Sequence, residues 1–387
     1  MTGSSRKPPS PALETLCLHA GAASLSAEFG LNTPVVTSSA FDYRDGTVRY
    51  PRYHNSLNHA VVSARLAALE GAEQALVTAS GMGAISAIMM TLTRPGDHVI
   101  LLDGLYGGTM DLVAGLLVPH GLTYRLWDGR IDSLADCIGD RTRLVMVESP
   151  TNPLLDVIDL PGLADLARSH GIVSVIDNTF ATPVLQQPLK LGFDLVVHSG
   201  TKYLSGHSDL LCGVLAGSQA LLGPLKETVI RLGASLNGQD LALLERSLKT
   251  LVLRVQRQSE NARTLADRLA GHPGIAGVRY PGRGGERERD LATSQMADGG
   301  GMLAFWLAAD RDPARFLDAL ALICPAVSLG GVESTICQPA LTSHARLEPD
   351  ERARLGIDER LMRLSVGIEG IDDLWRDLQA GLEQAAY

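Results

Sequence analysis

The sequence predicts an α/β protein: a mainly parallel sheet with helices on both faces, followed by a smaller α+β part. Two observations carry this prediction. Between residues 75 and 199, apolar runs of strand length alternate with segments of helical length, which is typical of strand–helix–strand units in a parallel sheet. Beyond residue 299, the expected strands and helices are less regularly interleaved, which is typical of an α+β arrangement.

Five apolar runs predict the buried strands, since each has strand length and ends at polar or small residues. In chain order they are ALVTAS (75–80), HVILLD (98–103), RLVMVES (143–149), GIVSVID (171–177) and FDLVVHS (193–199). An amphipathic helix is expected from residue 61 to near Gly71, ahead of the first strand. The helices expected after it lie at 81–93, 108–121, 160–171 and 182–192.

The C-terminal third predicts a second unit. A long helical region over residues 236–271 leads into strands at 299–309 and 361–369 and helices at 311–323 and 371–385. We therefore expect three parts. They are an extended N-terminal arm over 1–60, a large domain over 61–250 and a small domain over 251–387. Residues 1–11 are polar and rich in proline, without the apolar segment of a signal peptide, and predict a disordered tail.

Composition excludes several classes of function. The 387 residues are 45% hydrophobic and carry a net charge of −9, without a cluster of basic residues for nucleic acid. No apolar run reaches the roughly 18 residues that a membrane span needs. The five cysteines include no CxxC pair. They predict reduced thiols in a cytoplasmic protein, with no disulfide framework and no metal site.

Lys202 is the first candidate for chemistry. It lies in HSGTKYLSGHSD (198–209), directly after a predicted strand, with the hydroxyls of Ser199 and Thr201 and the small Gly200 beside it. A single lysine is ordinarily a solvated side chain. In a partly dry site, however, lysine has a lowered pKa and can form a Schiff base with a carbonyl group.

Asp177 supplies a possible partner, because it ends an apolar strand one strand–helix–strand unit before Lys202. Such an aspartate can simply cap a helix, but pyridoxal phosphate requires both a Schiff-base lysine and an acidic residue at its ring nitrogen. Polar residues at the carboxyl ends of parallel strands gather at one edge of the sheet. Asp103, Glu148 and Ser199 also end predicted strands.

The stretch TASGMGAIS (78–86) could hold a phosphate, because the backbone N–H groups of Gly81 and Met82 would open a helix after a strand. The same stretch is close to a dinucleotide-binding fingerprint, with Asp103 placed for a ribose. Ser86 stands where the third glycine or alanine belongs, so that fingerprint is incomplete. A nicotinamide cofactor would also leave Lys202 and Asp177 without a role, so we rank it below pyridoxal phosphate.

Several motifs in one order then resemble a known family. SVIDNTF, HSGTKYLSGHSD, YGGT, SLGGVES and RLSVGIE are similar to the pyridoxal-phosphate enzymes of trans-sulfuration. This family includes the cystathionine β- and γ-lyases, cystathionine γ-synthase, methionine γ-lyase and the homoserine-ester sulfhydrylases. The resemblance runs from about residue 30 to the C-terminus. It implies the fold-type I architecture with a seven-stranded type of sheet, pyridoxal 5′-phosphate as cofactor, and a homotetramer built from two catalytic dimers.

The resemblance also implies roles for individual residues. Around the cofactor they are Lys202 as Schiff-base lysine, Asp177 at the ring nitrogen, Tyr106 stacked on the ring, and Ser199, Thr201, Gly81 and Met82 at the phosphate. Tyr50 and Arg52 in YPRYHN would reach the phosphate of a neighbouring subunit. Arg363 would hold the substrate carboxylate, helped by Ser328 and Asn152. Gly200 departs from the pattern, since alanine is common there.

Two positions bear on the reaction. The γ-specific cystathionine enzymes typically carry glutamate where this chain has Val327, and a basic residue where it has Asp111. An acid at position 111 resembles the β-lyases and could attract the distal ammonium of cystathionine; NSLNH (55–59) also resembles them. YGGT and GGVES are more similar to γ-enzymes. Gly108 stands where methionine γ-lyases usually have cysteine.

The sequence therefore favours a cystathionine β-lyase that releases homocysteine, pyruvate and ammonia. The alternatives are cystathionine γ-lyase, methionine γ-lyase, and a γ-replacement enzyme such as cystathionine γ-synthase or a sulfhydrylase. A non-catalytic scaffold that binds pyridoxal phosphate would have no need of Lys202, Asp177, Tyr106 and Arg363 together.

Overall fold

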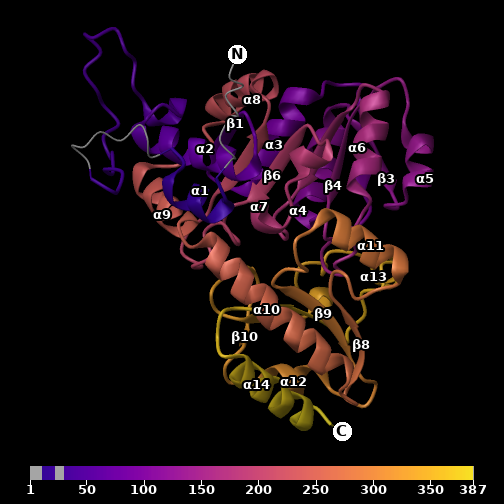
Figure 1. Ribbon diagram of the computed structural model, residues 1–387. Helices are drawn as coiled ribbons and strands as arrows, with labels where there is room; N and C mark the ends of the chain where they lie inside the picture. Colours follow the sequence, from indigo (N-terminus) through magenta and orange to yellow (C-terminus); the bar gives the residue numbers. More distant parts are fainter. Residues whose placement is uncertain (1–10, 22–29, 387) are drawn as a thin grey trace, which may run out of the picture.

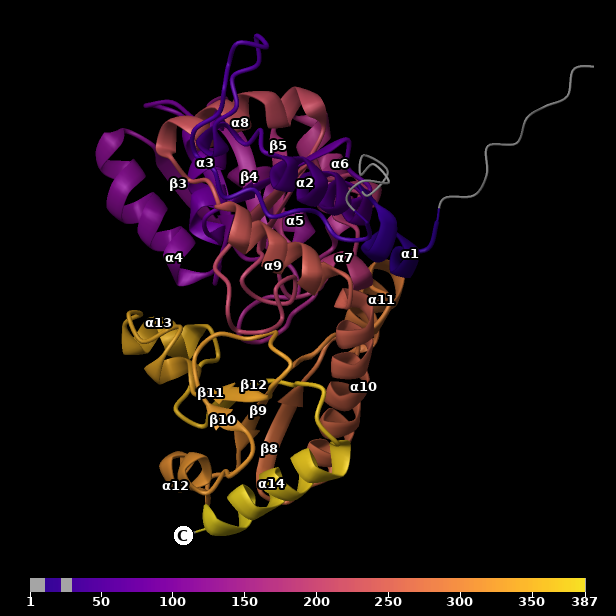
Figure 2. The ribbon, with the colours of Figure 1, turned by 90° about the vertical axis from the view of Figure 1, so that its left-hand side faces the viewer.

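The computed structural model describes residues 11–21 and 30–386. In this part of the chain, a large α/β body and a smaller α+β body lie end to end, and the long helix α10 (Leu251–Ala270) leads from one to the other (Figure 1 and Figure 2). The tail predicted over residues 1–11 falls, except for its last residue, outside the described residues.

A seven-stranded sheet forms the centre of the large body. Its strands, in spatial order, are β1 (Gln74–Thr78), β7 (Gly213–Gly217), β6 (Leu195–Ser199), β5 (Val173–Asp177), β4 (Thr142–Glu148), β2 (His98–Leu102) and β3 (Thr123–Trp127). β7 runs antiparallel to both of its neighbours, and all other neighbouring pairs are parallel. The predicted mainly parallel sheet and its five buried strands are confirmed.

Two strands of this sheet were not predicted. β3 is an edge strand whose first four residues are exposed, so it lacks a continuous apolar run. β7 is five residues long and has glycine at both ends, which weakens any strand signal in a sequence.

Helices cover both faces of the large sheet. Those of the large body are α2 (Leu57–Glu70), α3 (Gly81–Leu92), α4 (Gly107–Met110), α5 (Ile131–Leu134), α6 (Leu160–Ser169), α7 (Thr182–Leu185), α8 (Gln219–Leu232) and α9 (Gly238–Leu248). α4 continues as a π-helical stretch, Asp111–Leu117. The short helix α1 (Leu13–His19) packs on α2 and α10, within the segment that the sequence predicts to be an extended arm.

Local chemistry sets several helix boundaries. The side chains of Ser56 and Ser80 cap α2 and α3. Because of the first cap, α2 begins four residues before the predicted start at residue 61, and it ends at Gly71 as predicted. The helix predicted over 182–192 is broken by Pro188, which has no N–H for a helical hydrogen bond. The long helical region divides at Thr250, whose backbone leaves the helical conformation.

The smaller body contains a five-stranded sheet. Its strands, in spatial order, are β10 (Cys324–Pro325), β11 (Thr335–Cys337), β12 (Leu361–Ser365), β9 (Met302–Leu307) and β8 (Ile275–Arg279). Its other helices are α11 (Glu286–Gln295), α12 (Pro313–Asp318), α13 (Pro349–Arg354) and α14 (Ile371–Gln384). α10 packs on β8 and β9, and the edge-to-face pair of Phe305 and Phe316 joins the sheet to α12.

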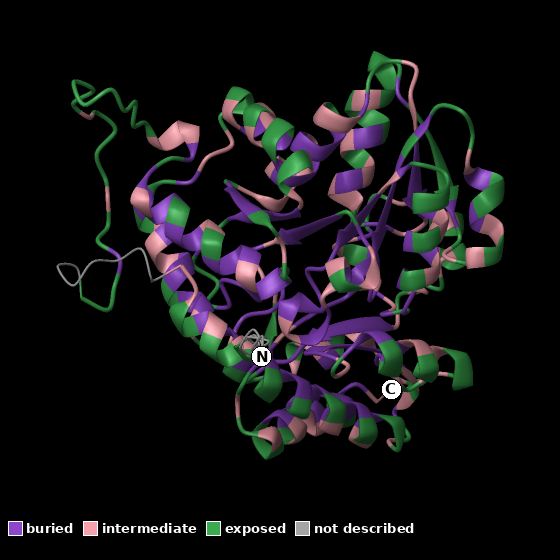
Figure 3. Ribbon diagram, turned by 45° about the horizontal axis from the view of Figure 1, so that its top comes forward, coloured by how far each residue is buried: buried purple, intermediate pink, exposed green. Residues whose placement is uncertain are grey.

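Burial follows these layers. Figure 3 shows the strands of the large sheet buried between the helices, and the segment after residue 30 exposed. That segment carries several large apolar side chains in contact with solvent, namely Leu31, Val35, Tyr43 and Val48. Among the described helices, none combines the length and the apolar character needed to cross a membrane.

Glycines allow a close approach of backbones where β7 meets the start of α3. Gly213 pairs with Thr78 on one side and with Ser199 on the other. A Cβ atom at Gly213 would lie 2.2 Å from the Ser80 carbonyl oxygen and 2.4 Å from the Thr78 hydroxyl. A Cβ atom at Gly81 would lie 3.1 Å from Ser199 Cα. The loop between β1 and α3 is therefore held at a fixed distance from the end of β6.

We expect Gly213→Ala to destabilise the protein, because the added methyl group meets backbone atoms that cannot move aside. Overpacking of this kind costs about 1–3 kcal/mol of the free energy of unfolding. Gly115→Ala is the matched control: Gly115 is exposed in the helical stretch Asp111–Leu117, has no proline beside it, and a Cβ atom there would meet no atom of another segment within 4 Å. Alanine at this position should stabilise the helix by up to about 1 kcal/mol. Thermal or urea unfolding would measure both, and equal stability of the two variants would contradict the packing argument.

Candidate functional site

The predicted strand-end residues come together at the carboxyl edge of the large sheet. β4, β5 and β6 are parallel neighbours, and Glu148 is the register partner of Asp177. Ser199 ends β6, next to β5. Register partners on parallel strands project their side chains to the same side of a sheet, so the two carboxyl groups lie side by side.

Asp177 is buried and partly satisfied by a residue two positions later. The Thr179 backbone N–H and hydroxyl both donate to Asp177 Oδ1. The Thr179 hydroxyl in turn accepts the Ser199 N–H at 2.8 Å. Burial raises the pKa of Asp177, and the two Thr179 hydrogen bonds oppose that rise. No described residue donates a hydrogen bond to the second oxygen, Oδ2.

Lys202 lies in the turn after β6 and is partly buried. Its Nζ donates to Ser328 Oγ at 2.7 Å. Burial is the main cause that lowers the pKa of Lys202, and the positive charge of Arg363 adds to it. Both effects favour the neutral amine, which is the form that acts as a base or a nucleophile.

Arg363 reaches this region from β12 of the small sheet and is buried. Its Nη1 donates to Asn152 Oδ1 at 2.7 Å, and its Nη2 lies 3.5 Å from the Ser328 carbonyl oxygen. Ser328 has a backbone φ of +82°, which a non-glycine residue rarely adopts. The structure therefore brings Lys202, Ser328, Arg363 and Asn152, to which the resemblance assigns roles, into one connected group, and those roles stay predictions.

The residues expected at a phosphate lie at the start of α3 and the end of β6. Ser80 Oγ caps α3 by accepting the Gly83 N–H at 3.0 Å, which leaves the first turn of the helix with free N–H donors. Gly81 in that turn packs on Ser199. The Thr201 hydroxyl, in contrast, is already hydrogen-bonded to the backbone of Cys212 in both directions.

A neighbouring side chain occupies the space beside Gly200. A Cβ atom on Gly200 would lie 2.5 Å from the sulfur of Cys212 and 3.4 Å from Val214 Cγ2. Cys212 is fully buried. The space that a methyl group would take at position 200 therefore belongs to the Cys212 sulfur.

Tyr106 stands just before α4, and 46% of its surface is exposed. A Cβ atom on Gly108 would lie 2.6 Å from Tyr106 Cε1 and 3.2 Å from the sulfur of Met82. The ring therefore lies directly over Gly108, next to the start of α3. This position suits a ring that covers a ligand held between α3 and the end of β6.

Tyr50 and Arg52 do not join this group within the described chain. Arg52 Nη1 donates to the Ile230 carbonyl oxygen of α8 at 2.9 Å. Its guanidinium lies 5.5 Å from the ring centre of Tyr50 and 5.0 Å from that of Tyr53. Their predicted role in a neighbouring subunit stays a prediction.

The two residues expected to select the reaction lie near the surface. Asp111 forms an ion pair with Arg346, a residue that the sequence analysis did not single out. Val327 precedes Ser328 and is 67% exposed. Asp103 pairs in the same way with Arg354 of α13, so it is not free to bind a ribose.

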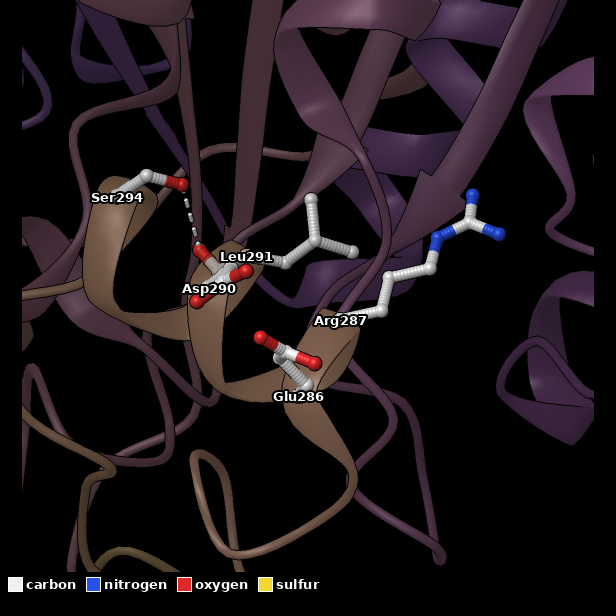
Figure 4. Close-up of a pocket in the computed structure, with 5 residues that line it drawn as sticks. All are labelled: Glu286, Arg287, Asp290, Leu291 and Ser294. Atoms are coloured by element: carbon white, nitrogen blue, oxygen red, sulfur yellow. Dashed lines mark hydrogen bonds between the residues drawn. The ribbon is translucent and has the colours of Figure 1, made fainter.

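A separate hollow of about 470 Å³ lies on the surface of α11. Figure 4 shows that its lining residues, Glu286, Arg287, Asp290, Leu291 and Ser294, all belong to this one helix. In the described chain, no hydrogen bond or ion pair joins them to Lys202, Ser328, Arg363 or Asn152, so we do not assign the hollow to the site. Among residues 11–21 and 30–386, no cluster of three histidine, cysteine or acidic side chains could hold a metal ion.

The group fits pyridoxal phosphate on the chemistry of its donors. Asp177 is a buried carboxyl group with one oxygen left without a donor and a raised pKa, and a protonated ring nitrogen beside it would stabilise its charged form. Lys202 is a lysine with a lowered pKa. The capped N-terminus of α3 offers N–H groups to an anion.

Sequence reasoning missed Thr179, which orients Asp177 and links it to Ser199. The motif DNTF contains a signal for it, because the backbone N–H two residues after an aspartate commonly donates to the aspartate side chain. Arg346 had no signal, because its partner Asp111 lies 235 positions away in the chain.

Comparisons with known proteins agree with this geometry. The chain is 45% identical to L-methionine γ-lyase of Pseudomonas putida, over 87% of this chain and 85% of that protein. It is 38% identical to cystathionine β-lyase of Coxiella burnetii, over 96% and 97%. The crystal structure of cystathionine γ-lyase from Lactobacillus plantarum complexed with L-serine matches with a TM-score of 0.93 at 36% identity, over 97% of this chain and 99% of that one.

The family model described as Cys/Met metabolism PLP-dependent enzyme matches residues 14–383. The fold, the cofactor and the family that the sequence motifs imply are thereby confirmed. The chain belongs to the pyridoxal-phosphate-dependent enzymes of cysteine and methionine metabolism.

Proposed function

We propose that the protein is a carbon–sulfur lyase that cleaves L-cystathionine by α,β-elimination to homocysteine, pyruvate and ammonia. The observation that carries this proposal is the ion pair of Asp111 and Arg346. The distal end of cystathionine bears both an ammonium and a carboxylate group, whereas methionine ends in an uncharged methyl thioether. The carboxylate of Asp111 and the guanidinium of Arg346 are complementary to the charged distal end of cystathionine. They make no ionic contact with the methyl thioether of methionine.

The pair lies where the distal end of a substrate would leave the site. Asp111 is four residues after Gly107, so the two share one face of the helix that starts behind Tyr106. A Cβ atom on Gly107 would lie 3.6 Å from the Ser343 carbonyl oxygen, which places this face against the segment that carries Arg346. Both charged side chains are largely exposed, so a substrate group can exchange with either partner.

Val327 supports β-elimination for a different reason. γ-Elimination and γ-replacement require a second proton to be removed, from Cβ of the substrate. Val327 adjoins Ser328, the hydrogen-bond partner of Lys202, and its side chain is exposed and apolar. It therefore adds no basic group beside the lysine.

The residues of the site then have distinct tasks. Arg363 holds the substrate carboxylate with its planar guanidinium, which Asn152 orients. The neutral amine of Lys202 takes the proton from Cα, and Ser328 positions that amine. Pyridoxal phosphate, when bound, supplies the electron sink for the carbanion. The buried site around Asp177 and Thr179 excludes water from the charges that develop.

Methionine γ-lyase is the second candidate, because the relative from Pseudomonas putida with that name is 45% identical to this chain. Other relatives are named cystathionine γ-synthase and cystathionine γ-lyase. Lys202 could in principle move both protons of these reactions. Gly108, over which the Tyr106 ring lies, and the Asp111–Arg346 pair favour cystathionine.

The arm around Tyr50 and Arg52 supports an assembly of several copies. Its apolar side chains Leu31, Val35 and Tyr43 are exposed, and an exposed apolar segment of this kind is typical of a subunit interface. We propose that the arm completes the phosphate site of a second copy, in a cytoplasmic homotetramer.

Incubation of the purified protein with L-cystathionine should yield homocysteine and pyruvate, identified by mass. Elimination at Cβ breaks the bond between sulfur and the three-carbon half of the substrate, which gives these products. Cysteine with 2-oxobutyrate would show γ-elimination instead. An absence of cleavage together with release of methanethiol from methionine would favour the second candidate.

Replacing Lys202 with alanine should lower turnover by at least about 100-fold, because the base at Cα is lost. The visible absorbance of the bound cofactor should be lost or shifted as well. Lys190→Ala is the control, since Lys190 contacts only Gln187 through its amine in the described chain. A Lys202→Ala variant with wild-type turnover would show that the site has been misplaced.

Asp111→Ala and Arg346→Ala should each raise KM for cystathionine by up to about fivefold, because a contact to one exposed charge contributes little. Turnover of methionine, if detectable, should not change. Arg354→Ala serves as the control, since it removes a similar ion pair to Asp103 from the same segment. An equal effect of the Arg346 and Arg354 variants would contradict a role of the first in binding the distal group.

A further inference from the structure

Glu148 is a buried carboxyl group at the centre of the site to which no task has been given. It ends β4 beside Asp177 and is 5% exposed. Its Oε1 has no hydrogen-bond partner among the described residues. A carboxyl group in such a place is costly when charged, so its presence calls for a function.

The surroundings of Glu148 contain two loops of the site. The backbone N–H groups of Tyr106 and Asn152 face its carboxyl group and lower its pKa. Tyr106 directly precedes α4, and its ring is the one expected to cover the site. Asn152 Oδ1 accepts a hydrogen bond from Arg363 Nη1 at 2.7 Å. One side chain thus lies between the loop of the covering ring and the loop that orients the carboxylate-binding arginine.

The charges around Glu148 oppose its ionisation. Burial is the largest effect that raises its pKa, and the neighbouring Asp177 raises it further. Arg363, from β12, and the two backbone N–H groups lower it, but the net pKa lies well above the ordinary value. Two adjacent buried carboxyl groups rarely ionise together, and Asp177 has the Thr179 hydrogen bonds to stabilise its charge.

We propose that Glu148 is an uncharged positioning residue, which ties the Tyr106 loop to the Asn152 loop and leaves Asp177 as the single anion at this edge of the sheet. It does not touch the reacting atoms. It acts through Asn152, which aligns Arg363, and through the backbone at Tyr106, which fixes the position of the Tyr106 ring over the site. The proposal holds for any of the reactions of the family, so it is independent of the choice of cystathionine as substrate.

Two substitutions separate position from charge. Glu148→Gln keeps the shape and remains neutral, and should leave kcat/KM within about threefold of the wild type. Glu148→Ala removes the carboxyl group that faces the backbone N–H groups of Tyr106 and Asn152, and should lower kcat/KM by about 10- to 100-fold. We expect much of that loss in KM for the amino acid, because Arg363 is no longer aligned, together with a shift of the visible absorbance of the bound cofactor.

The stability of the holoenzyme gives a readout that does not depend on turnover. A carboxyl group with a raised pKa in the folded protein stabilises the fold at low pH, and this contribution is lost as the pH rises towards the folded-state pKa. Glutamine does not titrate. The melting temperature of Glu148→Gln minus that of the wild type should therefore increase as the pH is raised from about 5 to about 8.

Glu260→Gln is the matched control, because Glu260 is 57% exposed at the surface of α10, and its effect on melting should not grow with pH. If Glu148→Gln were as inactive as Glu148→Ala while melting normally, the charged form would be required and the proposal would be wrong. It would also be wrong if the difference in melting temperature did not change with pH, or if Glu148→Ala retained wild-type kcat/KM and absorbance.

Discussion

Burial of the Asp177 carboxyl group is the constraint on which the site depends. A buried carboxylate needs a positive partner or hydrogen-bond donors, and no described residue donates a hydrogen bond to Asp177 Oδ2. The parallel order of β4, β5 and β6 places Asp177 between Glu148 and the end of β6. Thr179 then fixes the carboxyl group and, through Ser199, couples it to the place where the phosphate is expected. We propose that the protonated ring of the cofactor is the cation that completes this arrangement.

The smaller body contributes the positive charge of the site, through Arg363. Arg363 comes from its sheet, and its charge adds to the burial that lowers the pKa of Lys202. Ser328, held with a positive φ, touches both residues. The same guanidinium that would hold the substrate carboxylate thus also favours the neutral amine of the lysine. Binding a carboxylate would reduce the net positive charge near Lys202, so the basicity of the amine should increase when the substrate arrives.

Many residues of this site could be predicted from the sequence, because they lie at the ends of predicted strands. Asp177, Glu148 and Ser199 were identified because the ends of parallel strands meet at one edge, and the structure confirms that they meet. The partners of these residues were harder to predict. β7 is short and flanked by glycines, and Arg346 meets Asp111 only after the two bodies have packed. Pairings across such separations follow from the tertiary fold and leave no periodic signal in the chain.

Because the Cys212 sulfur lies against Gly200, the residue that is tolerated at either of these two positions depends on the residue at the other. Alanine is common at position 200 in the family that the motifs resemble, yet here its methyl group would fall 2.5 Å from the sulfur. A chain that gains the alanine first must push Cys212 into a core without free space. A chain that first exchanges Cys212 for a smaller residue can accept the alanine afterwards. The order of the two substitutions therefore decides whether the intermediate sequence has an overpacked core.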